Sequence, residues 1–136
     1  YRYEDRFNGE PGIIDVEQWG DIEWESMNNM FYGASLQDIS ATDTPDLSNV
    51  KDMSQMFAYS AFDDNIEDWD TSNVENMSEM FRGSLFDQPL NDWDTSSVTD
   101  MSAMFADTSS FNQDIGGWGK RNGERKDNMF VRFSVF

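Results

Sequence analysis

The sequence contains no cysteine and no histidine. The lack of cysteine excludes disulfide bonds, thiolate nucleophiles and thiolate metal sites, and the lack of histidine excludes an imidazole base or metal ligand. Basic residues are also scarce: 9 stand against 27 acidic residues, and the net charge is −18 at pH 7. Because such a chain repels phosphate groups, we expect neither a nucleic acid nor an anionic membrane surface as its partner.

Long hydrophobic runs are missing as well. No apolar stretch approaches the ~18 residues that a membrane-spanning helix requires, so we expect no membrane insertion by this segment. The sequence begins at Tyr1, so a signal peptide or anchor would lie outside it. What the chain does contain is large apolar side chains: 15% of its residues are aromatic, and it has nine methionines and five tryptophans. This composition predicts a folded, acidic domain rather than a solvated coil.

The strongest pattern is an internal repeat. The stretch "WDTSNVENMSEMF", which begins at Trp69, is followed 24 residues later by "WDTSSVTDMSAMF", which begins at Trp93. Four apolar columns recur with this spacing: Val50, Val74 and Val98; Met53, Met77 and Met101; Met56, Met80 and Met104; and Phe57, Phe81 and Phe105. We call each repeat a coil, and a related unit around Trp24 brings the number to at least four.

The repeat predicts the organisation of the chain. Residues 1–18 are expected to form an N-terminal cap and residues 19–118 a four-coil stack. Met129 and Phe130 continue the spacing, but the residues between them and the preceding coil do not. Residues 119–136 are therefore expected to be a degenerate fifth coil or a C-terminal cap, and the sequence leaves both alternatives open.

Two short elements are expected in each coil. The apolar residues in the second half of a coil are spaced like the stripe of an amphipathic helix, as in Val74, Met77, Met80 and Phe81. Ser72 and Glu75 have the form of a capping box, and Gly83 is placed to end the helix. The stretch "FDQPLNDW", from Phe86, alternates apolar and polar residues and predicts a short strand.

A helix and a strand of this size cannot bury their apolar faces alone, so neighbouring coils must stack into one core. The sequence therefore predicts an α/β repeat solenoid with one short strand and one short helix per coil of 24–26 residues. The repeated methionine and phenylalanine columns are expected to form its core rather than a soft-metal site.

Several stretches resemble the BspA-like leucine-rich-repeat surface proteins of bacteria, which consist of tandem units of about 25 residues. These stretches are "IIDVEQWGDIEWESMNNMFYGASL", "ATDTPDLSNVKDMSQMF", "WDTSSVTDMSAMF" and "SSFNQDIGGW". The resemblance covers residues 13–118 and leaves residues 119–136 outside. It implies a leucine-rich-repeat-like solenoid on a secreted or surface-attached protein, with roles in adhesion and in binding host or matrix proteins.

The predicted strands suggest a binding surface. Residues that flank each inward-pointing Ile or Leu should point outward, and solenoids present such ladders to their partners. The candidates are Asp38, Ser40, Asn65, Glu67, Asn91 and Asp114. The alternative, that they are merely solvated polar positions, stays open. Pro89 lacks an N–H group and should interrupt the ladder.

Two other columns suggest chemistry. Asp46, Asp70 and Asp94 form a column of carboxylates and are weak candidates for a calcium site. N–H donors at the start of a helix would offset the repulsion between these carboxylates without a metal ion. We therefore predict no metal site and no cofactor. Trp69, Trp93 and Trp118 suggest carbohydrate platforms. Their regular position favours packing instead, with each indole N–H bonded to a neighbouring turn.

The resulting functional expectation is a non-catalytic interaction module. Carboxylate pairs can hydrolyse glycosides without His or Cys, but no residue interrupts the repeat in a way that builds an active site, so we predict no enzyme. The expected role is adhesion, with a protein or glycan ligand outside the cell, at the cell surface or in the extracellular medium. The alternative is a passive spacer or a filament-forming subunit whose copies associate head to tail.

Overall fold

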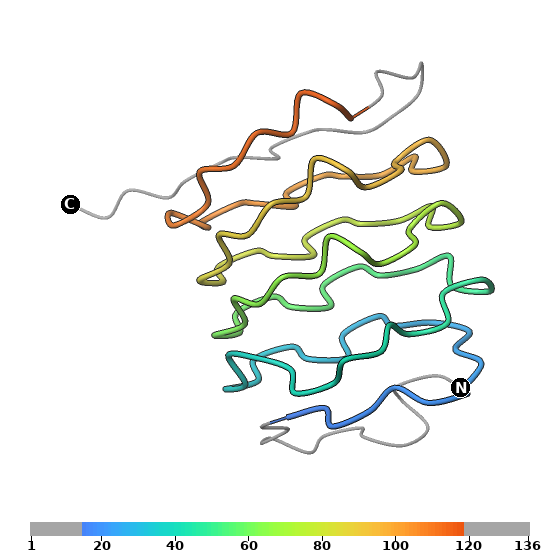
Figure 1. The fold of residues 1–136 in the computed structure, drawn as a ribbon. Coiled ribbons are helices and arrows are strands. Elements are labelled where there is room, and N and C mark those ends of the chain that lie inside the picture. Colours follow the sequence, from blue (N-terminus) through green and yellow to red (C-terminus); the bar gives the residue numbers. More distant parts are fainter. Residues whose placement is uncertain (1–14, 119–136) are drawn as a thin grey trace.

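The computed structural model describes residues 15–118. Most of the predicted N-terminal cap and all of residues 119–136 lie outside this range, so the two end assignments stay predictions. Figure 1 shows the described chain wound into successive coils that lie one above the next, from blue near residue 15 to orange-red at residue 118. Residues that are one repeat apart in the sequence therefore become neighbours in space.

The coils contain no helix anywhere in residues 15–118. Regular strands are absent from the same range too, and the coils are joined by isolated parallel bridges such as Glu23 with Asp46, Asp52 with Asn76, and Asn76 with Asp100. The prediction of an α/β repeat solenoid with one strand and one helix per coil is therefore wrong. The expected leucine-rich-repeat architecture is wrong for the same reason.

Consecutive tight turns replace the expected helix. We call residues 27–34, 53–60, 77–84 and 101–108 the turn segments. In segment 77–84 the N–H groups of Met80, Arg82 and Ser84 donate to the carbonyl oxygen three residues back, at 3.1–3.3 Å. Four other N–H groups donate to the next coil at 2.8–3.0 Å: Met77 to Asp100, Glu79 to Ser102, Phe81 to Met104 and Gly83 to Ala106. The fifth, of Ser78, donates to the Asn76 side chain at 2.9 Å. An α-helix would instead direct every N–H four residues back.

Left-handed backbone conformations exclude a helix at the same places. Glu79, the third residue of the first turn in segment 77–84, has φ of 55°, and Gly83, the third residue of the second turn, has φ of 64°. A positive φ at this position is typical of a type II turn. The other turn segments repeat the feature at Asn29, Gly33, Gln55, Tyr59, Ala103 and Asp107.

The turns also explain the misleading apolar pattern. In segment 77–84 the first and fourth residues of each turn face the core, so Met77, Met80, Phe81 and Ser84 are buried, whereas the two middle residues of each turn are partly exposed. This spacing by three resembles one face of a helix. The supposed capping residues have other roles: the Ser72 hydroxyl donates to Asp70, and the Glu75 N–H donates to the Lys51 carbonyl of the preceding coil.

The core consists of stacked columns of side chains. Met53, Met77 and Met101 are fully buried. Phe31, Phe57, Phe81 and Phe105 form one aromatic column, with ring centroids 5.4–5.6 Å apart between coils. Phe62, Phe86 and Phe111 form a second column beside it, and each contacts the first column at 4.0–4.1 Å. The predicted stacking of the methionine and phenylalanine columns is confirmed, and each stacked ring pair adds about 0.5–1.5 kcal/mol beyond the burial of its area.

Acidic side chains join the coils where strands were expected. We call residues 35–44, 61–68, 85–92 and 109–117 the connecting segments. The Asp63 carboxylate accepts hydrogen bonds from the Asp87 N–H at 2.9 Å and from the Gln88 amide at 3.1 Å. Asp87 receives the same pair from Asn112 and Gln113 one coil later. Side-chain oxygens thus take the place of backbone carbonyls, which is why these segments form no β ladder.

Candidate functional site

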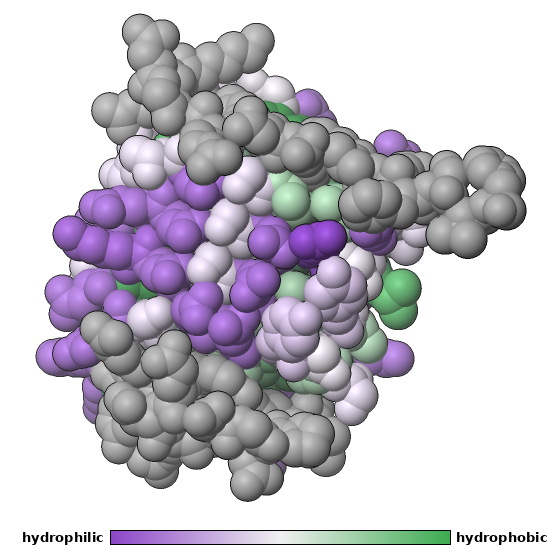
Figure 2. Space-filling view, turned by 180° about the vertical axis from the view of Figure 1, so that it is seen from behind, coloured by the Kyte–Doolittle hydropathy of each residue, from purple (hydrophilic) through white to green (hydrophobic). Residues whose placement is uncertain are grey.

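The predicted outward residues lie on the connecting segments and reach solvent. Asp38, Ser40, Asn65, Asn91 and Asp114 are exposed, and Glu67 is partly exposed. On the face of the molecule in Figure 2, hydrophilic residues cover a broad area, and hydrophobic residues are confined to small patches. The structure therefore places the candidates at the surface, and their role in binding stays a prediction.

Four of these six residues also hold the local backbone. Ser40 donates its N–H and its hydroxyl to Asp15 at 2.8 and 2.6 Å. The Asn91 amide oxygen accepts the Gly117 N–H of the next coil at 2.8 Å. Asn65 and Asp114 each accept the N–H two residues further along. No hydrogen bond from the side chain of Asp38 or Glu67 is found within residues 15–118, so these two are the most available to a partner.

The three aspartates considered for calcium sit in turns of their own. The Asp46 carboxylate accepts the hydroxyl of Ser48 at 2.6 Å and its N–H at 3.0 Å, and Asp70 accepts the same pair from Ser72. Asp94 accepts the Ser96 N–H at 2.9 Å. Within the described range, no three acidic side chains gather closely enough to hold a metal ion.

Hydrogen bonds rather than cations lower the pKa of these carboxyl groups. The Ser48 hydroxyl, followed by the Ser48 N–H, lowers the pKa of Asp46. The Ser72 hydroxyl and N–H lower the pKa of Asp70, although burial and the nearby Asp94 charge oppose the shift. The repulsion expected along the column therefore acts on Asp70, and the Ser72 donors outweigh it. These donors belong to side-chain turns and not to a helix start.

The packing of the tryptophans differs between coils. The indole N–H of Trp93 donates to the Ile66 carbonyl at 3.0 Å, and that of Trp118 donates to the Leu90 carbonyl at 2.9 Å. Both rings are buried. The prediction that these tryptophans pack, with the N–H bonded to a neighbouring turn, is confirmed for Trp93 and Trp118. Trp69 is buried too, at 6% exposure, but no hydrogen bond joins its N–H to any residue from 15 to 118.

The exception at Trp69 follows from an irregular preceding coil. Counting back 24 residues, Pro45 stands where Trp69 would be expected and Thr42 stands where Ile66 would be. In the later coil the Trp69 N–H donates to the Ile66 carbonyl at 3.1 Å and closes a turn. Pro45 has no N–H and cannot close the equivalent turn in its own coil. Trp69 contacts Trp19, which lies two coils earlier, with ring centroids 5.5 Å apart and planes perpendicular.

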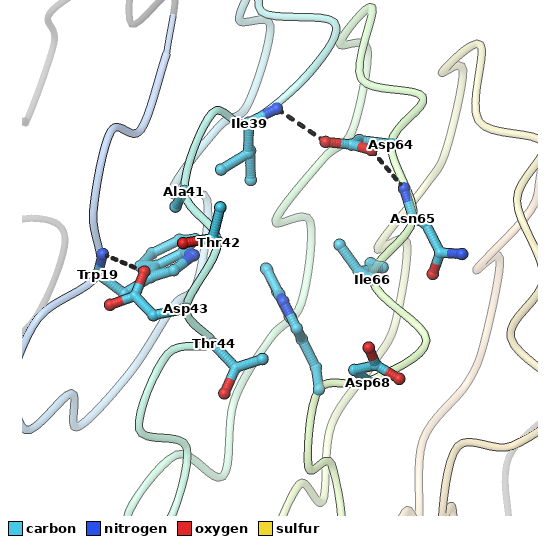
Figure 3. A pocket seen from close by; sticks show the side chains of 11 residues that line it. Trp19, Ile39, Ala41, Thr42, Asp43, Thr44, Asp64, Asn65, Ile66 and Asp68 are labelled. Carbon is cyan, nitrogen blue, oxygen red and sulfur yellow. Dashed lines mark hydrogen bonds between the residues drawn. The ribbon is translucent and has the colours of Figure 1, made fainter.

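The missing side chains leave a hollow of about 120 Å³ in the surface. Figure 3 shows Thr42 and Thr44 on one side of it and Ile66 and Asp68, from the next coil, on the other. Asp43 and Asp64 are held at its rim by backbone donors: Asp43 accepts the N–H of Trp19 at 3.0 Å and Asp64 that of Ile39 at 2.9 Å. The full lining is Trp19, Ile39, Ala41, Thr42, Asp43, Thr44, Asp64, Asn65, Ile66, Asp68 and Trp69.

Of the predicted outward residues, only Asn65 lines this hollow, and Trp69, which was considered as a carbohydrate platform, lines it too. Sequence reasoning missed Thr42, Asp68 and the free N–H of Trp69. The signal for them was Pro45, which interrupts the tryptophan column. Where one coil lacks a large side chain that the other coils have, the core is less densely packed at that position.

Comparison with known proteins adds a family but no activity. No curated protein and no solved structure matches the chain. Among residues 15–118 there is no helix with the length and apolar character needed to span a membrane. A family model described as "Mycoplasma protein of unknown function, DUF285" matches residues 25–136, which include the stretch after residue 118 that the earlier resemblance left out. The match covers most of the sequence, and the chain therefore belongs to the DUF285 family.

Proposed function

We propose that the chain is a non-catalytic interaction module that binds a protein or glycan outside the cell, in adhesion. The observation that carries this proposal is the repeated, exposed and rigidly held connecting segments. Bonds such as Asp63 to Asp87 and Asn91 to Gly117 fix each segment to the next coil. A surface that is already ordered loses little conformational entropy when it binds, which favours recognition by such a face.

The exterior location rests on the resemblance to BspA-like surface proteins. The charge agrees with a solvated interaction surface, since 27 acidic residues against 9 basic ones keep copies of the chain apart. Asp38 and Glu67 are the contact residues that we favour, because they are at least partly exposed and no hydrogen bond within residues 15–118 engages their side chains.

The test is binding of the purified monomer to an array of matrix proteins and glycans. We expect a hit that weakens at least about tenfold in the double variant Asp38→Ala/Glu67→Ala, since each side chain would contribute a contact worth about 1 kcal/mol. The matched control is Asn49→Ala/Asn73→Ala, which changes two exposed residues outside the connecting segments. Equal binding by both double variants would contradict the surface assignment. Filaments in light scattering together with no array hit would favour the spacer alternative.

A further inference from the structure

We propose that the hollow between connecting segments 35–44 and 61–68 binds one sugar unit of a glycan. This inference rests on the proposed function and deepens it, because it names the ligand class and the place. The hollow exists because Thr42 and Pro45 replace the Ile and Trp that fill the corresponding space one coil later. It is therefore a local departure from the repeat.

A residue that lines this hollow carries an unused hydrogen-bond donor. The Trp69 side chain is 6% exposed, and its N–H has no acceptor among residues 15–118, in contrast to the N–H groups of Trp93 and Trp118. The Trp69 N–H is not among the fully enclosed polar atoms that lack a partner, so solvent reaches it, and its residue lines the hollow. A bound ligand would have to offer it an acceptor.

Acceptors and hydroxyl groups surround the same space. Asp68 is exposed, and no hydrogen bond within the described range engages its carboxylate. Thr42 and Thr44 are exposed as well, and Figure 3 shows them across the hollow from Asp68. Asn65 uses its amide oxygen to accept the Glu67 N–H, which leaves its amide N–H groups as donors.

This set selects a ligand that both accepts and donates hydrogen bonds. A sugar hydroxyl can accept from the Trp69 N–H, and a neighbouring hydroxyl can donate to Asp68. An ammonium or guanidinium group would satisfy Asp68 but has no acceptor for the indole. Ile39 and Ile66 supply apolar surface for the C–H groups of a sugar ring. The volume of about 120 Å³ is well below that of a pocket for a drug-sized ligand, and it suits part of one ring.

The test uses the indole N–H signals in NMR spectra of the full chain. The five tryptophans give five signals, and Trp69→Phe identifies that of Trp69. The probes are glucose, galactose, mannose, N-acetylglucosamine and N-acetylneuraminic acid at millimolar concentration. We expect at least one sugar to shift the Trp69 signal and to leave that of Trp93 in place, since the Trp93 N–H already donates to Ile66.

Two variants and one control separate this site from a general effect. Asp68→Asn removes a charged acceptor and should weaken the sugar at least about tenfold. Thr42→Ile restores the side chain that the repeat has at Ile66 and should abolish the shift by filling the hollow. Asp92→Asn changes the exposed aspartate 24 residues after Asp68 and should leave the sugar affinity unchanged.

The outcomes also separate this inference from the proposed function. If glycans bind on the array but no sugar shifts the Trp69 signal, the hollow is not the site, although the module still binds glycans. A shift of the Trp69 signal by butylamine or guanidinium and by no sugar would overturn the ligand class. If a sugar shifts the Trp69 signal and Asp38→Ala/Glu67→Ala leaves the array binding unchanged, the hollow is a sugar site, and the assignment of Asp38 and Glu67 as contact residues is wrong.

Discussion

The ring of Tyr59 lies against the backbone of Gly83 in the next coil, where an added Cβ would come within 2.6 Å of the ring atom Cδ1. Gly33 occupies the same turn position, with a similar φ of 67°, and a Cβ there would meet no atom within 4 Å. The two glycines thus share a conformation and differ in the aromatic ring that lies against Gly83.

This difference predicts unequal costs for the same substitution. Gly33→Ala should lower the free energy of unfolding by about 1 kcal/mol, the cost of a left-handed conformation for alanine. Gly83→Ala should cost about 1 kcal/mol more, because Tyr59 must move and its contact with Tyr32, at 5.6 Å between centroids, is disturbed. Urea unfolding measures both values. In a Tyr59→Ala background the two substitutions should cost the same, and a persisting difference would refute the role of the ring.

The left-handed residues that are not glycine predict a stabilising change. Ala103 has φ of 54°, so Ala103→Gly should raise the free energy of unfolding by roughly 0.5–1 kcal/mol. Ala106 is buried at 2% exposure and has no positive φ. Ala106→Gly should therefore destabilise by about 1 kcal/mol, since it loses a buried methyl group and loosens the unfolded chain. Opposite signs in thermal or urea unfolding are expected, and a loss of stability in both would contradict the assigned turns.

The carboxylates that join the connecting segments are expected to stabilise the fold as hydrogen-bond acceptors and not through their charge. Asp87→Ala leaves the Asn112 N–H without its acceptor and leaves the Gln113 amide only the Asp87 carbonyl at 3.3 Å, and it should cost about 1–2 kcal/mol. Asp87→Asn keeps an oxygen at the same place and should stay within about 0.5 kcal/mol of the parent chain. If urea unfolding gives equal losses for both variants, the carboxylate acts through its charge and not as a bridge between coils.

The lowered pKa values of Asp46 and Asp70 predict acid sensitivity. A carboxyl group whose pKa is lower in the folded state stabilises the fold above the ordinary value of 3.8, and this contribution is lost as the pH falls through the folded value. Urea midpoints should therefore drop steeply below pH 3.8. Ser48→Ala/Ser72→Ala removes the hydroxyl donors and should flatten the drop, while Ser35→Ala, at an exposed position outside these turns, should not. An unchanged profile in the double variant would show that other groups control the acid transition.

Sequence reasoning recovered the stacking and the core because columns such as Phe57, Phe81 and Phe105 are explicit in the repeat. It could not choose between helix and turns from spacing, since both place every third or fourth residue on one face. The left-handed residues Gln55, Glu79 and Ala103 carry no local signal, because their conformation is imposed by bonds to the next coil. A better indication was available in the Asp or Asn that precedes a Ser by two positions, as at Asp70 and Ser72, which favours a side-chain turn over a helix interior.

The candidate surface shows a similar division. The outward positions of Asp38 and Glu67 followed from the alternation of the connecting segments. The hollow could not be derived from any single coil, since it results from the absence of a tryptophan at Pro45 and from the contact of Trp19 with Trp69 across that gap. Only a comparison of each coil with its neighbours, asking which large side chain is missing, would have identified it.

The alternation of N–H donors constrains how the chain can change in length. One residue inserted into a turn segment would send every donor of the following stretch to the wrong acceptor, so insertions and deletions there should be tolerated only as complete units. Consistent with this, Phe31 and Phe57 are 26 residues apart while Phe57 and Phe81 are 24 apart, and the two extra residues fall in the stretch between turn segments that includes Thr42 and Pro45. Binding specificity can therefore change through insertions between the turn segments. The turn segments themselves keep the spacing on which their hydrogen bonds to the next coil depend.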